Sequence, residues 1–377
     1  MIKRILQKQL EEKLFKGKLI LIFGPRQSGK TTLIKELVST CDDVLLLNGD
    51  EADVREELHN TTSTRIKTII AKSKIVVIDE AQRIPDIGLT LKLMVDTLPN
   101  VQVIASGSSA FELANRVNEP LTGRKYEFML FPVSFGELVG HHGILEEKRL
   151  LDHRLVFGSY PEIVTKQQEE KELLRLLTSS YLYKDLFSLE HMQKPAVLEK
   201  IVKSLALQIG SEVSYNEIGQ MVGANNETVE KYVTLLEQAY VVFRLPAFGK
   251  NVRNEIKKGK KIYFYDNGIR NAVIGNFTAL RSRSDIGVLW ENYVLSERMK
   301  LLHYSGSDAR PYFWRTTQQQ EIDYVEDRNG ILSAFEIKWN EKRKWKFPKT
   351  FMQNYPVAHH GIITPGTMEE FCLGNTP

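Results

Sequence analysis

Residues 24–31 constrain this chain more than any other segment. They read Gly-Pro-Arg-Gln-Ser-Gly-Lys-Thr, which satisfies the pattern G-x-x-x-x-G-K-[ST], and they lie between a strand-like apolar run and a helical segment. Glycines permit a backbone that curls its N–H groups around a phosphate, and the helix that follows adds the positive end of its dipole. The segment therefore predicts a phosphate-binding loop between a strand and a helix.

The residue types in this loop have expected tasks in binding ATP or ADP and Mg²⁺. Lys30 is expected to reach the β- and γ-phosphates, and the hydroxyl of Thr31 to bind Mg²⁺. The full set of nucleotide-binding candidates is Gly24, Pro25, Arg26, Gln27, Ser28, Gly29, Lys30, Thr31 and Thr32.

Two acids close the apolar run at residues 75–78. Asp79 is expected to bind Mg²⁺, and Glu80 to act as the general base for the water that attacks the γ-phosphate. The alternative is structural, because an Asp after a strand can simply cap a helix. The next apolar run ends in Ser106 and Ser108, either of which could sense the γ-phosphate or the attacking water.

The order of apolar runs predicts an α/β, multidomain chain. Strand-like and helical segments alternate up to about residue 140, which is typical of βαβ units around a buried parallel sheet. Helical periodicity dominates residues 150–239, and a helix followed by strand-like runs occupies the end of the chain. A length of 377 residues suits two to three domains. The expected division is 1–140, 141–280 and 281–377.

Residues 215–239 predict a helix, a turn at Gly223 and a second helix, followed by strand-like runs at 240–245 and 261–265. This order is typical of a winged helix. The second helix carries three glutamates and one lysine, which is unfavourable for contacting phosphate. A structural or interdomain role is therefore the alternative to reading DNA bases.

Basic residues concentrate in the last third of the chain, although the net charge is only +4. Residues 241–261 hold seven basic residues against one acid, and residues 338–349 hold six against one. Such stretches are either solvated faces or contacts to nucleic acid, so DNA is one candidate partner. The lysines expected to contact DNA phosphates include Lys257, Lys258, Lys260 and Lys261.

Residues 18–135 resemble the AAA+ class of P-loop ATPases. Residues 24–31 stand in the Walker A role, and Asp79 and Glu80 stand in the Walker B role. Ser106 or Ser108 lies near the sensor-1 position. The resemblance implies ATP hydrolysis on a parallel-sheet core, with Lys30 and Glu80 as catalytic residues.

AAA+ proteins commonly supply an arginine to the γ-phosphate, often from a neighbouring subunit. The resemblance therefore also implies that a homo-oligomer is one candidate assembly. Arg124 is the catalytic candidate, with Arg116 as a second choice, because both follow the sensor strand. A structural or solvent-facing arginine is the alternative.

The resemblance extends over nearly the whole chain, to a widespread bacterial and archaeal group of ATPases whose biological role is not established. It implies an AAA+ core, a winged helix and a C-terminal domain of restriction-endonuclease-like fold. The segments that carry it, besides the Walker motifs, are residues 121–124, 131–135, 158–162, 181–185 and 263–268.

Four residues near the C-terminus resemble the PD-(D/E)XK nuclease pattern: Glu291, Asp323, Glu336 and Lys338. Alternation along a strand puts Glu336 and Lys338 on one face, and the carboxylates could hold a second Mg²⁺ or Mn²⁺ while the lysine orients a water. An acid two residues before a lysine is also an ordinary surface pair. Both an active nuclease and an inert domain of the same fold fit the pattern.

Several classes of protein are excluded. The longest apolar runs, such as residues 19–23, fall far short of the ~20 residues of a membrane helix, and the first residues lack the apolar core of a signal peptide. Cys41 and Cys372 are too few for a disulfide framework or a zinc ribbon. A cytoplasmic protein without a membrane partner is expected.

Two functions fit these observations. The first is a Mg²⁺-dependent AAA+ ATPase whose nucleotide state controls the winged-helix and nuclease-like domains on DNA. The alternative is a nucleotide-gated regulatory switch that binds a protein partner and carries an inactive nuclease-like domain.

Overall fold

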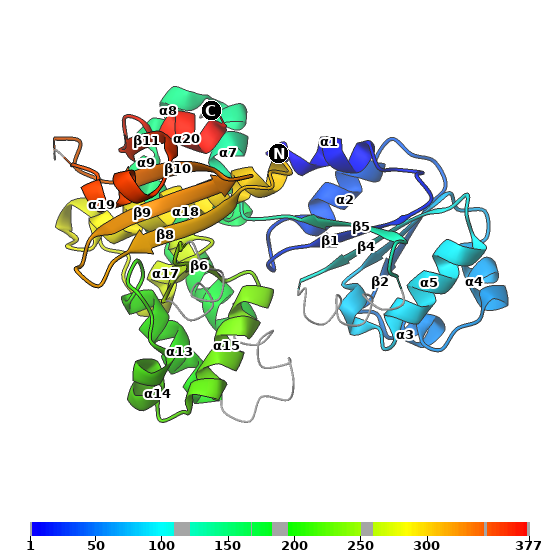
Figure 1. Ribbon diagram of the computed structural model, residues 1–377. Helices are drawn as coiled ribbons and strands as arrows, with labels where there is room; N and C mark the ends of the chain where they lie inside the picture. The colour runs from blue at the N-terminus through cyan, green and yellow to red at the C-terminus, as the bar shows by residue number, and fades with distance from the viewer. Residues whose placement is uncertain are drawn as a thin grey trace. The chain divides into compact units, whose positions relative to one another are not determined.

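The computed structural model describes residues 2–108, 121–166, 168–182, 195–249, 259–342 and 345–374. The chain forms two compact units (Figure 1). The first comprises Met1–Pro132 with Gln238–Tyr240, and the second comprises Val133–Glu237 with Val241–Pro377.

The first unit is built on a five-stranded sheet in the order β2-β3-β4-β1-β5, in which all pairs are parallel. Its strands are β1 (Leu19–Phe23), β2 (Val44–Asn48), β3 (Ile75–Asp79), β4 (Gln102–Gly107) and β5 (Lys125–Met129). The central strands β1 and β4 are buried along their whole length, which confirms the predicted parallel sheet. The edge strand β5 is only half-buried, so it has no continuous apolar run and the sequence did not reveal it.

The helices of the first unit follow the strands in the expected alternation. They are α1 (Leu6–Glu11), α2 (Lys30–Val38), α3 (Ala52–Leu58), α4 (Ser63–Ile70), the 3-10 helix η1 (Ala81–Arg83) and α5 (Ile87–Thr97). Helix α1 lies against α2, and α4 lies against α5 (Figure 1).

The second unit begins with helices, which confirms the predicted helical middle of the chain. These are α7 (Phe135–His142), α8 (Ile144–Arg149), α9 (Leu151–Phe157), α10 (Pro161–Thr165), α11 (Glu170–Leu176), the π-helix η2 (Leu177–Leu182), α13 (Pro195–Leu207), α14 (Tyr215–Val222) and α15 (Asn226–Gln238). Helices α14 and α15 follow one another through Gly223, whose φ of 72° suits glycine.

Two strands follow α15 and form an antiparallel pair, β6 (Val242–Pro246) and β7 (Lys260–Phe264). The helices and strands expected of a winged helix are therefore present in order. The winged helix itself stays a prediction, because residues 250–258, which would form the wing, lie outside the described residues.

The remainder of the second unit is a mixed four-stranded sheet with helices. Its elements are α17 (Asn267–Ile274), the 3-10 helix η4 (Leu280–Ser282), α18 (Ile286–Tyr304), β8 (Arg310–Arg315), β9 (Glu321–Arg328), β10 (Ile331–Ile337), α19 (Lys349–Asn354), β11 (Val357–Ile363) and α20 (Met368–Leu373). The strand order is β11-β10-β9-β8, with β10 and β11 parallel and the other pairs antiparallel. Helix α18 contacts β10 and α20. The Asn329-Gly330 turn joins β9 to β10 as predicted, and both residues have positive φ.

The motifs at residues 158–162 and 263–268 contact each other inside the second unit. Asp266 caps α17 and accepts the backbone N–H of Ser159 at 2.7 Å. Gly158 has a φ of 72°, and a Cβ atom there would collide with the Asp266 carboxylate, so only glycine fits. These motifs are therefore part of the framework of this unit.

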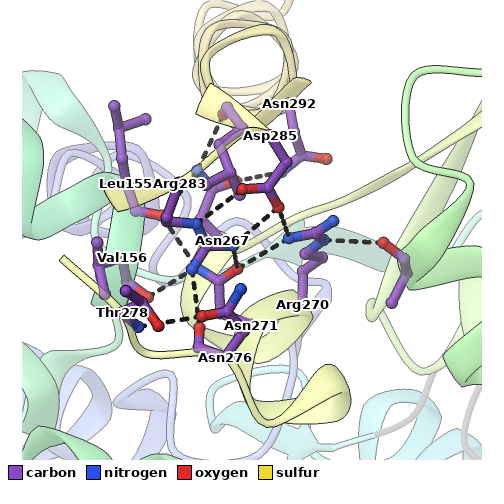
Figure 2. Close-up of polar contacts among 12 residues, drawn as sticks. Leu155, Val156, Asn267, Arg270, Asn271, Asn276, Thr278, Arg283, Asp285 and Asn292 are labelled. Atoms are coloured by element: carbon purple, nitrogen blue, oxygen red, sulfur yellow. Dashed lines mark hydrogen bonds and ion pairs between the residues drawn. The ribbon is translucent and has the colours of Figure 1, made fainter. Parts of the chain in front are cut away.

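A buried polar network extends this framework to the start of α18 (Figure 2). The side-chain amide of Asn267 donates to the carbonyls of Leu155 and Leu289, at 3.3 and 3.0 Å. Asp285 accepts from Arg283 at 2.8 Å and from Arg270 at 2.7 Å. Residues before and after position 280 thus share one network, and the predicted division into three domains stays a prediction.

Asp285 predicts a pH dependence of stability. Burial alone would raise the pKa of Asp285, but the hydrogen bonds and charges of Arg283 and Arg270 outweigh it and lower the pKa to about 2. A carboxylate with a lowered pKa stabilises the folded state above its unfolded pKa and loses that contribution as pH falls toward 2.

We therefore expect Asp285→Asn to reduce the free energy of unfolding at pH 7 by about 1–2 kcal/mol, a figure discounted for the partial exposure of the carboxylate. The difference from the parent protein should shrink as pH is lowered from 5 toward 2, which urea unfolding at several pH values measures. An equal difference at pH 7 and pH 3 would contradict the assignment.

Among the residues described, no helix combines the length and apolarity needed to cross a bilayer.

Candidate functional site

Residues 24–31, here called the phosphate loop, connect the end of β1 to the start of α2. Gly29 has a φ of 96°, and Gln27 has a φ of 61°, so the loop bends tightly. A Cβ atom on Gly24 would overlap the backbone oxygen of Leu130, so glycine is required there for packing. The loop is therefore shaped by glycines at the positions that the sequence pattern predicted.

Lys30 begins α2 and is buried, with 5% of its surface exposed. Its ammonium donates to the carbonyls of Gly24 and Pro25, at 2.9 and 3.1 Å. The side chain thus folds back over the phosphate loop, and the positive charge lies beside the backbone that would surround a phosphate.

Thr31, Asp79 and Ser106 come together although they are far apart in sequence. The hydroxyl of Thr31 donates to Asp79 Oδ2 at 2.6 Å, and the hydroxyl of Ser106 donates to Asp79 Oδ1. They meet because β1, β3 and β4 are parallel and end at the same edge of the sheet. Hydroxyl and carboxylate oxygens are the ligands that Mg²⁺ prefers, so this set fits the metal.

A pocket of about 200 Å³ opens beside Thr31 and Asp79, between α2 and strands β2 and β3. Lys35 and Glu51 also line it. The two residues that would hold Mg²⁺ therefore border an open pocket.

Glu80 follows Asp79 in a left-handed conformation, with a φ of 50°. Its carboxylate accepts a hydrogen bond from the side-chain amide of Gln82 at 2.6 Å, and the same nitrogen donates to Ser108 at 3.1 Å. Gln82 is buried and joins the two predicted residues. No sequence pattern marks Gln82, because only the turn of η1 brings its amide back to Glu80.

Arg124 does not join this site within one chain. Its carbonyl accepts the N–H of Leu19, at the start of β1, and its guanidinium pairs with Asp96 at 2.7 Å. The phosphate loop follows the other end of β1, about 16 Å away for a strand of this length. A catalytic role for Arg124 would require a neighbouring subunit, and Arg116 lies outside the described residues.

Three family models match this chain. Residues 16–139 match a family described as "AAA domain". The first part of the chain is therefore similar to AAA domains. Residues 148–280 and 286–375 match two domains of unknown function, DUF8612 and DUF4143, so the AAA domain is followed by two further family domains.

Relatives align with most of this chain and with most of their own length. The uncharacterized protein Rv2008c of Mycobacterium tuberculosis is 27% identical, over 98% of this chain and 81% of that protein. The uncharacterized protein MJ1544 of Methanocaldococcus jannaschii is 22% identical, over 90% of this chain and 80% of that protein. Among solved structures, the Walker-type ATPase PABY2304 of Pyrococcus abyssi has a TM-score of 0.50 and 15% identity, over 73% of this chain and 96% of that one. The last comparison shows a shared fold.

The residues predicted for the C-terminal site also meet. The ammonium of Lys338 lies 2.7 Å from Asp323 Oδ2 and 2.8 Å from Glu336 Oε2. Glu336 is buried at the end of β10, and Asp323 accepts the N–H of Ile337 at 2.8 Å. Burial and the nearby Asp323 raise the pKa of Glu336 to about 8, against the opposing effect of Lys338. The cluster therefore holds a carboxyl group that resists ionisation.

Glu291 is held by two residues of β7 that the sequence analysis did not connect with it. Its carboxylate accepts the hydroxyl of Tyr263 at 2.5 Å and lies 3.4 Å from the ammonium of Lys261. Lys261 is 2% exposed and also pairs with Glu321 at 2.5 Å. No pattern within residues 281–377 could have revealed these partners, because they come from an earlier segment.

The prediction that Lys261 contacts DNA phosphates is wrong, because this buried ammonium is paired with carboxylates inside the protein. The ammonium of Lys260 lies 3.8 Å from the centre of the Tyr215 ring, and burial lowers its pKa. Lys257 and Lys258 lie outside the described residues.

The C-terminal cluster does not display a metal site. Among the described residues, no group of three or more His, Cys, Asp or Glu side chains is arranged to hold a metal ion. Instead, the ammonium of Lys338 lies between Asp323 and Glu336. The nuclease-like fold and the second Mg²⁺ or Mn²⁺ therefore stay predictions.

Proposed function

We propose that this protein binds ATP and hydrolyses it in a Mg²⁺-dependent reaction. The observation that carries the proposal is the meeting of Thr31, Asp79 and Ser106 beside the phosphate loop, in a domain that matches the AAA family.

Each residue of this site has a distinct task in the proposed reaction. Lys30 exchanges the carbonyls of the phosphate loop for the β- and γ-phosphates. Thr31 and Asp79 hold Mg²⁺, which neutralises phosphate charge and orients the γ-phosphate when bound. Glu80 accepts a proton from the attacking water, and Gln82 holds the Glu80 carboxylate in place.

The nucleotide state then controls the second unit, in one of two ways. In the first, the protein acts on DNA, and ATP turnover rises when DNA is bound. In the second, the protein is a regulatory switch for a protein partner. The buried pairing of Lys261 removes one expected DNA contact, whereas the basic residues at 250–258 lie outside the described residues. A cytoplasmic location stays the expectation for either function.

The deciding experiment measures ATP turnover by the full chain, with and without single- and double-stranded DNA, in Mg²⁺ and in Mn²⁺. Turnover that DNA stimulates supports the first function. Turnover indifferent to DNA, together with ATP-dependent assembly with a protein, supports the switch. The absence of ATP binding under all these conditions would refute both.

A second candidate activity is metal-dependent DNA cleavage at the C-terminal cluster. It is favoured by the meeting of three of the four residues of the nuclease pattern, Asp323, Glu336 and Lys338. Mg²⁺ or Mn²⁺ would have to displace the Lys338 ammonium from between the carboxylates.

If that activity exists, Asp323→Ala should remove DNA cleavage and leave ATP turnover unchanged, because the phosphate loop belongs to the other unit. A cleavage assay on plasmid DNA in Mn²⁺ and a phosphate-release assay measure the two activities. Asp327→Ala, at a half-buried position near the end of the same strand β9, is the control. Cleavage that survives Asp323→Ala would point to a contaminant or to another site.

A further inference from the structure

Arg4 lies behind the phosphate loop, in the segment that precedes α1. Its guanidinium donates to the carbonyl of Ser28 at 2.7 Å and to the carbonyl of Phe131 at 2.6 Å. Arg4 is 8% exposed, and Ser28 is fully buried. A charged side chain is thus buried within the first unit, with two of its nitrogens bonded to backbone carbonyls.

The second carbonyl belongs to the segment that supports the loop. The N–H of Leu130 donates to the carbonyl of Phe23 at 2.7 Å, and the oxygen of Leu130 packs against Gly24. Phe131 follows directly, so Arg4 bonds the middle of the phosphate loop to the chain that borders its first residue. Pro132, the next residue, is the last of this segment of the first unit. The guanidinium of Arg4 therefore bonds both to the phosphate loop and to the end of that segment.

The hydrogen bond to Ser28 also sets the orientation of the peptide group between Ser28 and Gly29. The peptide group between Ser28 and Gly29 is trans, so its carbonyl and its N–H point in opposite directions. Because the carbonyl points toward Arg4, the N–H of Gly29 points away from it.

We propose that Arg4 is a positioning residue for nucleotide binding, which holds the Ser28 carbonyl so that the Gly29 N–H faces the phosphate. Its charge, buried behind the loop, also favours an anion in front of it. A guanidinium suits this task because two nitrogens of one rigid, planar group donate to two separate carbonyls. A lysine ammonium has the same charge but only one nitrogen. The inference rests on the proposed binding of ATP by the phosphate loop.

The test compares Arg4→Ala and Arg4→Lys with the parent chain. Calorimetry measures the Kd for ATP with Mg²⁺, and phosphate release measures KM and kcat. Arg4→Ala should raise Kd and KM roughly tenfold or more, because charge-assisted hydrogen bonds are lost, with a smaller change in kcat. The Kd and KM of Arg4→Lys should lie between those of Arg4→Ala and those of the parent chain. Low-millimolar guanidinium should restore part of the affinity of Arg4→Ala.

Lys3→Ala is the matched control, since it removes a neighbouring but exposed cation and should leave Kd unchanged. A parent-like Kd in folded Arg4→Ala would overturn the inference. So would a weakened Kd that neither guanidinium nor Arg4→Lys restores, since Arg4 would then only stabilise the unit. If Arg4→Ala does not fold, the Kd of Arg4→Lys decides: a value above that of the parent protein supports the inference, and an equal value overturns it. Failure of the parent protein itself to bind ATP would refute the proposed function instead.

Discussion

Lys30→Ala is expected to abolish tight ATP binding, with Kd raised on the order of a hundredfold. The Lys30 ammonium is buried beside the phosphate loop and bonded to two of its carbonyls. Alanine removes the cation that would contact the β- and γ-phosphates, while the fold of α2 should persist because alanine favours helices. Titration calorimetry with ATP and Mg²⁺ measures the change.

Lys67→Ala, at an exposed position of α4 in the same unit, is the control and should bind ATP like the parent protein. Thermal unfolding of both variants establishes that they remain folded. An unchanged Kd in Lys30→Ala would mean that ATP does not bind at residues 24–31, and the proposed function would fall.

Glu80→Gln is expected to retain ATP binding and to lose hydrolysis, with kcat reduced about 10²- to 10⁴-fold. An amide has nearly the same shape as a carboxylate but cannot accept a proton from water at neutral pH. Because Asp79, and not Glu80, is the carboxylate proposed to bind Mg²⁺, Kd should change little. Phosphate release gives kcat, and calorimetry gives Kd.

Normal turnover in Glu80→Gln would remove this residue from the role of general base. Gln82→Ala separates base chemistry from positioning, since it frees the Glu80 carboxylate without altering it. We expect a loss of kcat smaller than that of Glu80→Gln, so equal losses would mean that Gln82 itself takes part in the reaction.

Local patterns predicted most of the first unit. The phosphate loop, the acids that end β3 and the serines that end β4 all lie at the ends of buried strands, and the strands were evident as short apolar runs. Parallel strands bring their carboxyl ends to one edge, so a one-dimensional pattern was sufficient to predict that Asp79 lies beside the phosphate loop, with Ser106 or Ser108 nearby. For the C-terminal cluster, strand alternation together with the nuclease resemblance led to the prediction that Asp323 lies near Glu336 and Lys338.

The sequence by itself thus determined the phosphate loop, its partners at the strand ends and most of the order of helices and strands, the half-buried edge strand β5 excepted. Each of these features depends on neighbours in the chain or on strand periodicity. Only the tertiary structure decided which distant side chains join them. Arg4 reaches Phe131 across 127 positions, and Lys261 reaches Glu291 from a strand before the C-terminal helices. A lysine in a basic stretch looks the same in sequence whether it faces solvent or a buried carboxylate, and only packing distinguishes the two.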